Sequence, residues 1–192
     1  MALEHAILVS LAEQPASGYD LTRRFDRSIG LFWRATHQQV YRTLARMEAD
    51  GLVASTAVEQ QGRPDKKVFA IADAGRDALT SWVDAPSAVE QTRSDLAVRV
   101  RGLHHGDASA VLDDVRRHLV AHRERLEGFR RSSERHYPDP GALAPEDVGP
   151  YLVLRGGIRT EEAVVAWCEE IIATSAVTPA DPAGRRPAPP AR

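Results

Sequence analysis

Apolar residues recur at intervals of three or four in three short stretches near the start of the chain, which predicts three short helices. The first stretch covers about residues 2–13 and the second residues 18–30, with a proline- and glycine-containing break between them. The third begins after Thr36, a favourable N-cap, and stops at Gly51. The apolar stripes, in the same order, are Leu3, Ile7, Leu8 and Leu11; Leu21, Phe25 and Ile29; and Val40, Leu44 and Met47.

A β-hairpin and a fourth helix are expected next. Residues 52–58 and 68–71 are rich in β-branched and aromatic side chains, and the connector between them holds a glycine and a proline. Residues 72–84 then show the apolar spacing of a helix. Three helices, a hairpin and a helix are the order of a winged helix-turn-helix, so residues 1–86 are predicted to form such a domain.

The pattern changes beyond the hinge expected at Pro86. A short helix is predicted over residues 94–104, a long one over residues 107–135 and a last one over residues 148–175. In the long helix the apolar residues alternate spacings of three and four, which is a heptad seam. The predicted fold is therefore mainly α with a small β-hairpin wing, and a long-helix domain follows the winged helix-turn-helix.

The seam of the long helix indicates a homodimer. Two long amphipathic helices are not expected to bury both stripes against each other and also cover the seam, so the same helix of a second copy is the simplest partner. Residues 94–175 are therefore predicted to form a helical dimerisation domain, and the proline-rich residues 176–192 a disordered tail. The seam residues assigned to dimerisation are Leu112, Val115, Leu119, His122, Leu126 and Phe129.

Composition excludes several classes of protein. A formal net charge of −2 argues against a protein that binds polyanions without selectivity, so any contact with nucleic acid must come from a local patch. The one cysteine, Cys168, excludes an internal disulfide. No apolar run approaches about 18 residues, and the first residues lack a basic segment and a cleavage signal. A cytoplasmic protein without a membrane partner is expected.

The third helix carries a local patch of this kind. Its face opposite the apolar stripe displays glutamine and arginine, which can reach the edges of adenine and guanine in a major groove. Six arginines against two aspartates lie between residues 19 and 46, and they suit phosphate neutralisation. The hairpin tip adds Arg63, Lys66 and Lys67. A solvated face of good helix formers is the alternative, but the joint occurrence of helix and hairpin in chain order favours DNA.

Three segments of the chain are similar to the winged-helix domain of PadR-like transcriptional regulators. They read "ALEHAILVSLAEQPASGYDL", "FWRATHQQVYRTLARMEADGLV" and "GRPDKKVFAIADAGRDAL". The later segment "LRGGIRTEEAVVAWCEE" resembles the terminal helix of the family's longer branch, whose C-terminal domain is like that of virulence activators. The matching positions of the first part are Gly18-Tyr19, Phe32-Trp33, Tyr41-Arg42, Leu44, Glu48, Gly51-Leu52, Gly62-Arg63-Pro64 and Ala74-Gly75.

This resemblance implies a homodimeric, sequence-specific regulator that binds double-stranded DNA, usually a repressor released by a small effector. It places Tyr41 against a phosphate and makes the basic hairpin residues the wing. Where many relatives have Pro-Gly before Leu-Tyr-Arg, this chain has His37-Gln38-Gln39-Val40-Tyr41, so its base contacts cannot be copied from theirs. The residues expected to contact DNA are Thr36, His37, Gln38, Gln39, Tyr41, Arg42, Arg46, Arg63, Lys66 and Lys67.

Other chemistry is weakly supported. Cys168 lies on an apolar stripe beside two glutamates and is expected to be a core thiol, so no enzymatic activity and no cofactor are predicted. His118 and His122 have a spacing that suits a metal, but no third ligand is defined and no metal is predicted. Four aromatic residues near the join of the domains are candidates for an effector pocket or for core: Trp33, Trp82, Tyr151 and Trp167. An activator, or a carrier or scaffold that does not bind DNA, stays open as an alternative.

Overall fold

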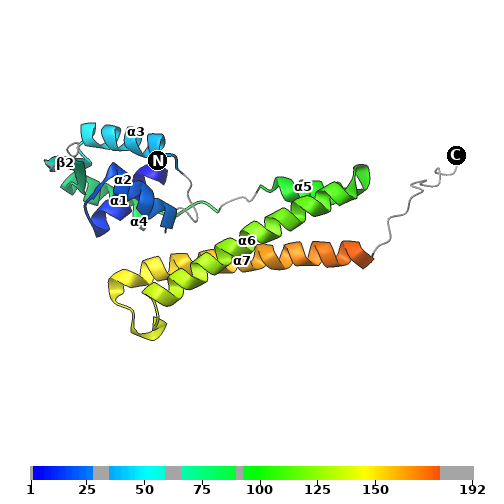
Figure 1. Cartoon of the computed structure of the whole chain (residues 1–192). Coiled ribbons are helices and arrows are strands. Elements are labelled where there is room, and N and C mark those ends of the chain that lie inside the picture. The colour runs from blue at the N-terminus through cyan, green and yellow to red at the C-terminus, as the bar shows by residue number, and fades with distance from the viewer. Residues whose placement is uncertain (1, 28–34, 59–65, 90–92, 178–192) are drawn as a thin grey trace. The chain divides into compact units, whose positions relative to one another are not determined.

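The computed structural model describes residues 2–27, 35–58, 66–89 and 93–177 of the chain. The chain divides into two compact units, residues 1–91 and residues 92–192, and helices dominate both (Figure 1). In the part of the chain that is described, no helix is both long and apolar enough to span a bilayer. Some residues singled out in the sequence lie outside the described ranges, as do residues 178–192 of the predicted tail: Ile29, Phe32, Trp33, Gly62, Arg63 and Pro64.

The first unit is a winged helix-turn-helix, as the sequence predicted. Three helices are followed by a hairpin and a fourth helix, in the expected order. One strand was not predicted: a two-residue strand before the second helix pairs with the last hairpin strand and completes an antiparallel sheet of order β1-β3-β2. The elements are α1 (Ala2–Glu13), β1 (Ala16–Ser17), α2 (Gly18–Arg27), α3 (His37–Ala49), β2 (Val53–Val58), β3 (Lys66–Ile71) and α4 (Asp73–Asp84).

One apolar core holds these elements together. The described residues of the stripes predicted on the first three helices converge in it, with Leu3 partly buried at its edge, and the inward residues of the hairpin close it. Ile29 of the second stripe lies outside the described residues. Burial of such a set of aliphatic side chains is the main favourable contribution to the stability of the unit. The buried residues are Ile7, Leu8, Leu11, Ala16, Leu21, Phe25, Val40, Leu44, Met47, Val53, Phe69 and Ile71.

Two glycines shape the turn after α3. Gly51 has a φ of 72°, and the N–H groups of Gly51 and Leu52 donate to the carbonyls of Glu48 and Met47 at 3.1 and 2.8 Å. These are the two hydrogen bonds of a Schellman motif, which ends a helix at a left-handed residue. Gly75 on α4 is buried so closely that a Cβ there would lie 2.1 Å from the carbonyl oxygen of Leu52. The end of α3 is therefore fixed against the start of α4.

The second unit is built on a pair of long helices that lie side by side (Figure 1). Ion pairs Arg123–Glu169 at 2.6 Å and Arg130–Glu162 at 2.9 Å show that the pair is antiparallel. The last helix starts three residues before its predicted beginning, since Pro145 takes its first position, where the missing N–H has no helical partner to lose. The elements are α5 (Asp95–Arg101), η2 (Leu103–His105), α6 (Ala108–His136), η3 (Pro140–Ala142) and α7 (Pro145–Val177).

The heptad seam of α6 is covered within one chain. Val115 and Leu119 share a buried cluster with Cys168 and Ile171 of α7 and with Leu96 of α5. The premise that α6 and α7 could not bury their stripes against each other was therefore wrong. The physical reason is that the apolar stripe of α7 is wide enough to fill the seam, with Val164, Val165, Trp167 and Ile172 packed around the buried residues. The assignment of the seam to dimerisation stays a prediction.

Gly75→Ala is expected to destabilise the protein by about 1–3 kcal/mol, because the new methyl group would overlap the Leu52 carbonyl. Urea unfolding of the variant and the natural chain measures the difference. The neighbouring exposed residue provides a control, since Ala74→Ser adds one atom on the same turn and is expected to stay within about 0.5 kcal/mol. Equal stability of Gly75→Ala and the natural chain would contradict the close contact.

Candidate nucleic-acid interface

The start of α3 is fixed by a capping box. The Thr36 hydroxyl accepts the backbone N–H of Gln39 at 3.2 Å, and the Gln39 side-chain oxygen accepts the backbone N–H of Thr36 at 2.8 Å. The same oxygen also accepts the Thr36 hydroxyl proton at 3.1 Å. This arrangement satisfies N–H groups that have no partner inside the helix. Gln39 and Thr36 were expected to contact DNA, but in this structure their side chains hold the helix start.

Three of the residues expected to contact DNA have exposed side chains that make no polar contact with another described residue. His37, Gln38 and Arg42 are exposed, and none of these side chains forms a hydrogen bond or ion pair with any described residue. Gln38 and Arg42 lie on the face of α3 opposite the buried Val40 and Leu44, and His37 is the first residue of the helix. An arginine and a glutamine in the first two turns of such a helix carry the donors and acceptors that distinguish guanine and adenine in a major groove.

Tyr41 stands over the start of α2. A Cβ on Gly18 would lie 2.4 Å from Cε1 of the Tyr41 ring, so only glycine leaves room for the ring there. The tyrosine is 48% exposed, so part of it stays open to solvent beside the helix. The Gly18–Tyr41 contact joins the two helices of the helix-turn-helix, and no pattern along the chain indicates it.

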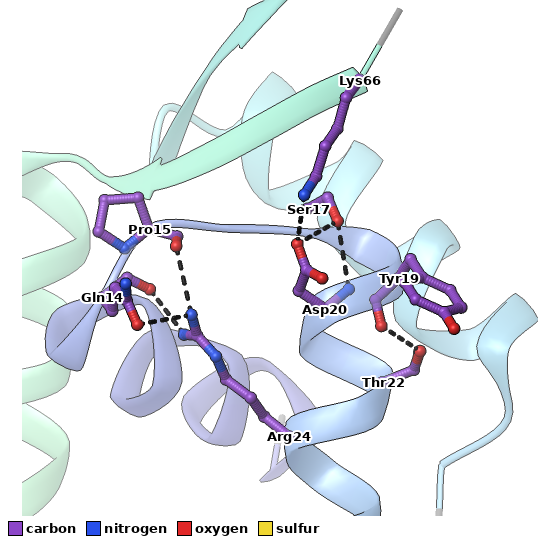
Figure 2. Close-up of polar contacts among 8 residues, drawn as sticks. All are labelled: Gln14, Pro15, Ser17, Tyr19, Asp20, Thr22, Arg24 and Lys66. Carbon is purple, nitrogen blue, oxygen red and sulfur yellow. Dashed lines mark hydrogen bonds and ion pairs between the residues drawn. The ribbon is translucent and has the colours of Figure 1, made fainter. Parts of the chain in front are cut away.

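Three cations of the expected interface have carboxylate partners within this unit. Arg46 pairs with Glu4 of α1 at 2.6 Å. Lys66 pairs with Asp20 of α2 at 2.7 Å, and Figure 2 shows its side chain reaching from the strand to the start of that helix. Lys67 pairs with Glu48 of α3, also at 2.7 Å. The two lysines are the first residues of β3, and Arg63 of the expected wing lies outside the described residues.

The two acids that hold the lysines are each fixed by a second donor. The Asp20 carboxylate accepts the Ser17 hydroxyl at 2.8 Å, while the Ser17 oxygen accepts the Asp20 N–H at 3.2 Å (Figure 2). Glu48 accepts the Ser55 hydroxyl from β2. Hydrogen bonds from Lys66 and then Ser17 lower the pKa of Asp20, and hydrogen bonds from Lys67 and then Ser55 lower the pKa of Glu48. Both acids therefore stay ionised at neutral pH.

Arg24 is engaged at the end of α1 and does not add a free cation. Its guanidinium donates to the carbonyl of Ser10 at 3.2 Å. It also donates to the carbonyls of Gln14 and Pro15 at 2.8 and 3.4 Å, and to the Gln14 side chain at 3.1 Å (Figure 2). Arg23 on the same helix is exposed, with its charge 5.9 Å from the Tyr19 ring centroid. The arginine-rich stretch is thus partly structural, which a count of charges along the sequence does not reveal.

Three of the four aromatic candidates for an effector site have contacts within their own units, and Trp33 lies outside the described residues. Trp82 is 47% exposed and stacks on His5 of α1, with ring centroids 4.5 Å apart. Tyr151 packs edge-on against Tyr137 at 5.5 Å, and Trp167 borders the core of the second unit. Tyr151 and Trp167 are sixteen residues apart on α7, which is roughly 24 Å along a helix. The two cannot line one small pocket, and the effector assignment stays a prediction.

Cys168 and the pair His118 and His122 were the other candidates for chemistry in the second unit. Burial, and to a lesser degree Glu169, raises the pKa of the Cys168 thiol, which opposes thiolate formation. The His118 and His122 rings stack with centroids 6.0 Å apart, and His122 binds the buried Glu161. Within the described ranges, no group of three or more histidine, cysteine, aspartate or glutamate side chains has the arrangement of a metal site.

The arrangement of the first unit defines a class of protein: a winged helix-turn-helix whose second motif helix presents polar side chains beside a hairpin. The model of the Transcriptional regulator PadR-like family matches residues 7–81, and that of the Virulence activator alpha C-term matches residues 92–175. The chain belongs to the PadR-like family of transcriptional regulators.

Relatives match almost the whole chain. "Probable transcriptional regulator Rv1176c" of Mycobacterium tuberculosis is 47% identical over 181 residues, 89% of this chain and 96% of the relative. "Negative transcriptional regulator PadR" of Bacillus subtilis is 29% identical over the same shares. Its structure with operator DNA has a TM-score of 0.80 at 26% identity and covers 91% of this chain and 98% of its own. The same protein has also been solved with p-coumaric acid, with a TM-score of 0.72 at 27% identity, 91% of this chain and 98% of its own.

A further solved structure, the Vibrio cholerae virulence activator AphA, has a TM-score of 0.74 at 30% identity. That match covers 91% of this chain and 98% of AphA. The relatives therefore include a protein named as a negative regulator and one named as an activator.

Thr36→Ala is expected to lower the free energy of unfolding by about 1 kcal/mol, because the N-cap side chain loses its bond to the Gln39 N–H. Thr36→Ser keeps an oxygen in place and is expected to retain most of the stability. Gln39→Ala should also destabilise the protein, whereas Gln38→Ala at the neighbouring exposed position should not. Thermal unfolding by circular dichroism measures all four, and equal effects at Gln38 and Gln39 would contradict the capping role.

Proposed function

We propose that this protein binds a pseudo-palindromic operator as a homodimer and represses transcription, and that a small effector releases it. The observation that supports the proposal most directly is the capped α3 helix with His37, Gln38 and Arg42 exposed and unengaged. A helix of this kind inserts its first turns into a major groove and reads base edges there. A two-fold dimer brings two such helices about one duplex turn apart, roughly 34 Å, which calls for two inverted half-sites.

Two relatives bear on the direction of control. The structure of Bacillus subtilis PadR with operator DNA supports operator binding by this chain, and the name of that protein favours repression. The name of AphA favours the alternative, an activator of the same fold. In vitro transcription separates repression from activation, with a promoter that carries a genomic DNA fragment selected by binding to the protein. A repressor lowers the transcript yield and an activator raises it.

A small effector is proposed to release the protein from its operator. The complex of Bacillus subtilis PadR with p-coumaric acid supports a small-molecule effector for this chain. An effector acts only if it binds one arrangement of the two recognition helices more tightly than another. A carrier or scaffold that does not bind DNA would instead show ligand binding and no salt-dependent affinity for any fragment.

Arg42→Ala is expected to reduce the preference for operator over random DNA by about fivefold to 150-fold, which corresponds to roughly 1–3 kcal/mol for a bidentate base contact. Fluorescence anisotropy with operator fragments, first selected from genomic DNA, measures both affinities. Arg76→Ala removes the same charge from an exposed position on α4 and should leave the preference unchanged. A preference that survives Arg42→Ala would remove arginine readout from the proposal.

Dimerisation is expected to give a particle of twice the single-chain mass in light scattering. Leu119 packs on α7 within the chain, so Leu119→Asp should lower the helix content of the protein as well as the mass of the scattering particle. Val120, the next residue, is 56% exposed, and Val120→Asp should keep the helices while weakening association if α6 contributes its open face. A natural chain that scatters as a single copy at micromolar concentration would contradict the homodimer.

A further inference from the structure

The chain has only two lysines, Lys66 and Lys67, against 23 arginines, and both lie at the tip end of the hairpin, where they pair with Val58 and Ala57 of β2. Successive residues of a strand point to opposite faces of its sheet. Lys66 therefore reaches one helix of the motif and Lys67 the other: Asp20 in the first turn of α2 and Glu48 in the last turn of α3. The two ammonium groups connect one strand to both helices of the helix-turn-helix.

The anchors of these ion pairs are organised before any DNA binds. Asp20 is held by Ser17 at the helix start, and Glu48 is held by Ser55 of the neighbouring strand β2. Each carboxylate thus has a second donor that keeps it in place when the lysine moves. A lysine presents a compact charge that suits a single carboxylate oxygen, whereas an arginine presents a flat fork that suits phosphates and guanine. The choice of lysine at these two positions fits the anchoring of a strand.

We infer that Lys66 and Lys67 are positioning residues that set the orientation of the hairpin relative to the recognition helix, with Asp20 and Glu48 as their anchors, and are not phosphate ligands. The inference rests on the proposed binding of DNA by this unit and revises the wing contacts expected from the sequence.

A lysine would gain little free energy by exchanging its carboxylate partner for a DNA phosphate. A lysine that left Glu48 for a DNA phosphate would replace one ion pair by another and leave an uncompensated carboxylate facing a polyanion. The side chains in the Lys67–Glu48 pair are 54% and 32% exposed, so the pair contributes modestly to overall stability, as surface ion pairs do. Its expected effect is on the position of the hairpin.

The sign of the Glu48→Gln effect on DNA affinity tests the inference. If Lys67 is a positioning residue, Glu48→Gln and Lys67→Met should each weaken operator binding by roughly twofold to fivefold, the scale expected for loss of one exposed ion pair. The double variant should be no weaker than either single one, because both changes remove the same pair. If Lys67 instead binds phosphate, Glu48→Gln should leave affinity unchanged or raise it.

The salt dependence of the DNA affinity is a second measurement, and it separates a positioning lysine from a phosphate ligand. Loss of a phosphate ligand lowers the slope of log affinity against log salt by about one. We expect the double variant Glu48→Gln with Lys67→Met, which keeps the net charge, to retain the slope of the natural chain. A slope lower by about one in this variant would overturn the inference. Arg76→Met serves as the control for loss of an exposed cation on the same unit.

A third measurement needs no DNA. Amine acylation followed by mass spectrometry reports each lysine separately, and each serves as the internal control of the other. Glu48→Gln should speed the acylation of Lys67 alone, and Asp20→Asn that of Lys66 alone, since each loses its anchor. Unchanged rates in both variants would overturn the anchoring. A natural chain that binds no DNA would instead contradict the proposed function, and the acylation rates would still decide whether the anchors exist.

Discussion

The two fixed ends of α3 are the constraint on which the interface depends. Thr36 and Gln39 set the first residue of the helix, and the left-handed Gly51 sets its last turn. Between two fixed ends, the 3.6-residue period decides which side chains point inward. The core is filled by Val40, Leu44 and Met47, and their burial fixes the rotation of the helix about its axis. Gln38 and Arg42 face outward as a consequence, because they lie on the opposite side of the helix.

Charge around this helix is balanced locally, and this explains how a chain of net charge −2 fits a DNA-binding fold. Arg46, Lys66 and Lys67 each face a carboxylate of the same unit. Arg42 has no such partner among the described residues, so its charge is the one left open at the centre of the helix face. The described cations around α3 are thus mostly paired, and a few exposed groups remain on its outer face.

Local signals in the sequence were sufficient for the α-helices and the hairpin. Tertiary contacts explain what was missed, such as the strand β1, which exists only through its pairing with β3. The spacing of Thr36 and Gln39 is that of a capping box and was readable, although Gln39 was assigned to DNA instead. The pairs of Arg46 with Glu4 and of Lys67 with Glu48 join residues 42 and 19 positions apart, and no pattern along the chain indicates them. The heptad seam was identified correctly, but periodicity shows that a stripe needs a cover without showing which helix provides it.

Because α7 packs on the apolar seam of α6 within one chain, the surface of the second unit that is open to a partner is a different one from that expected. Glu161 of α7 is only 7% exposed and receives Arg125 of α6 at 3.2 Å as well as His122. A slip of one turn between the helices would leave this buried carboxylate without its partners, which is far less favourable than any loss of exposed pairs. The register of α6 against α7 is therefore fixed inside one chain. Any contact between two copies must use the faces that this register leaves open, among them the face that carries Val120.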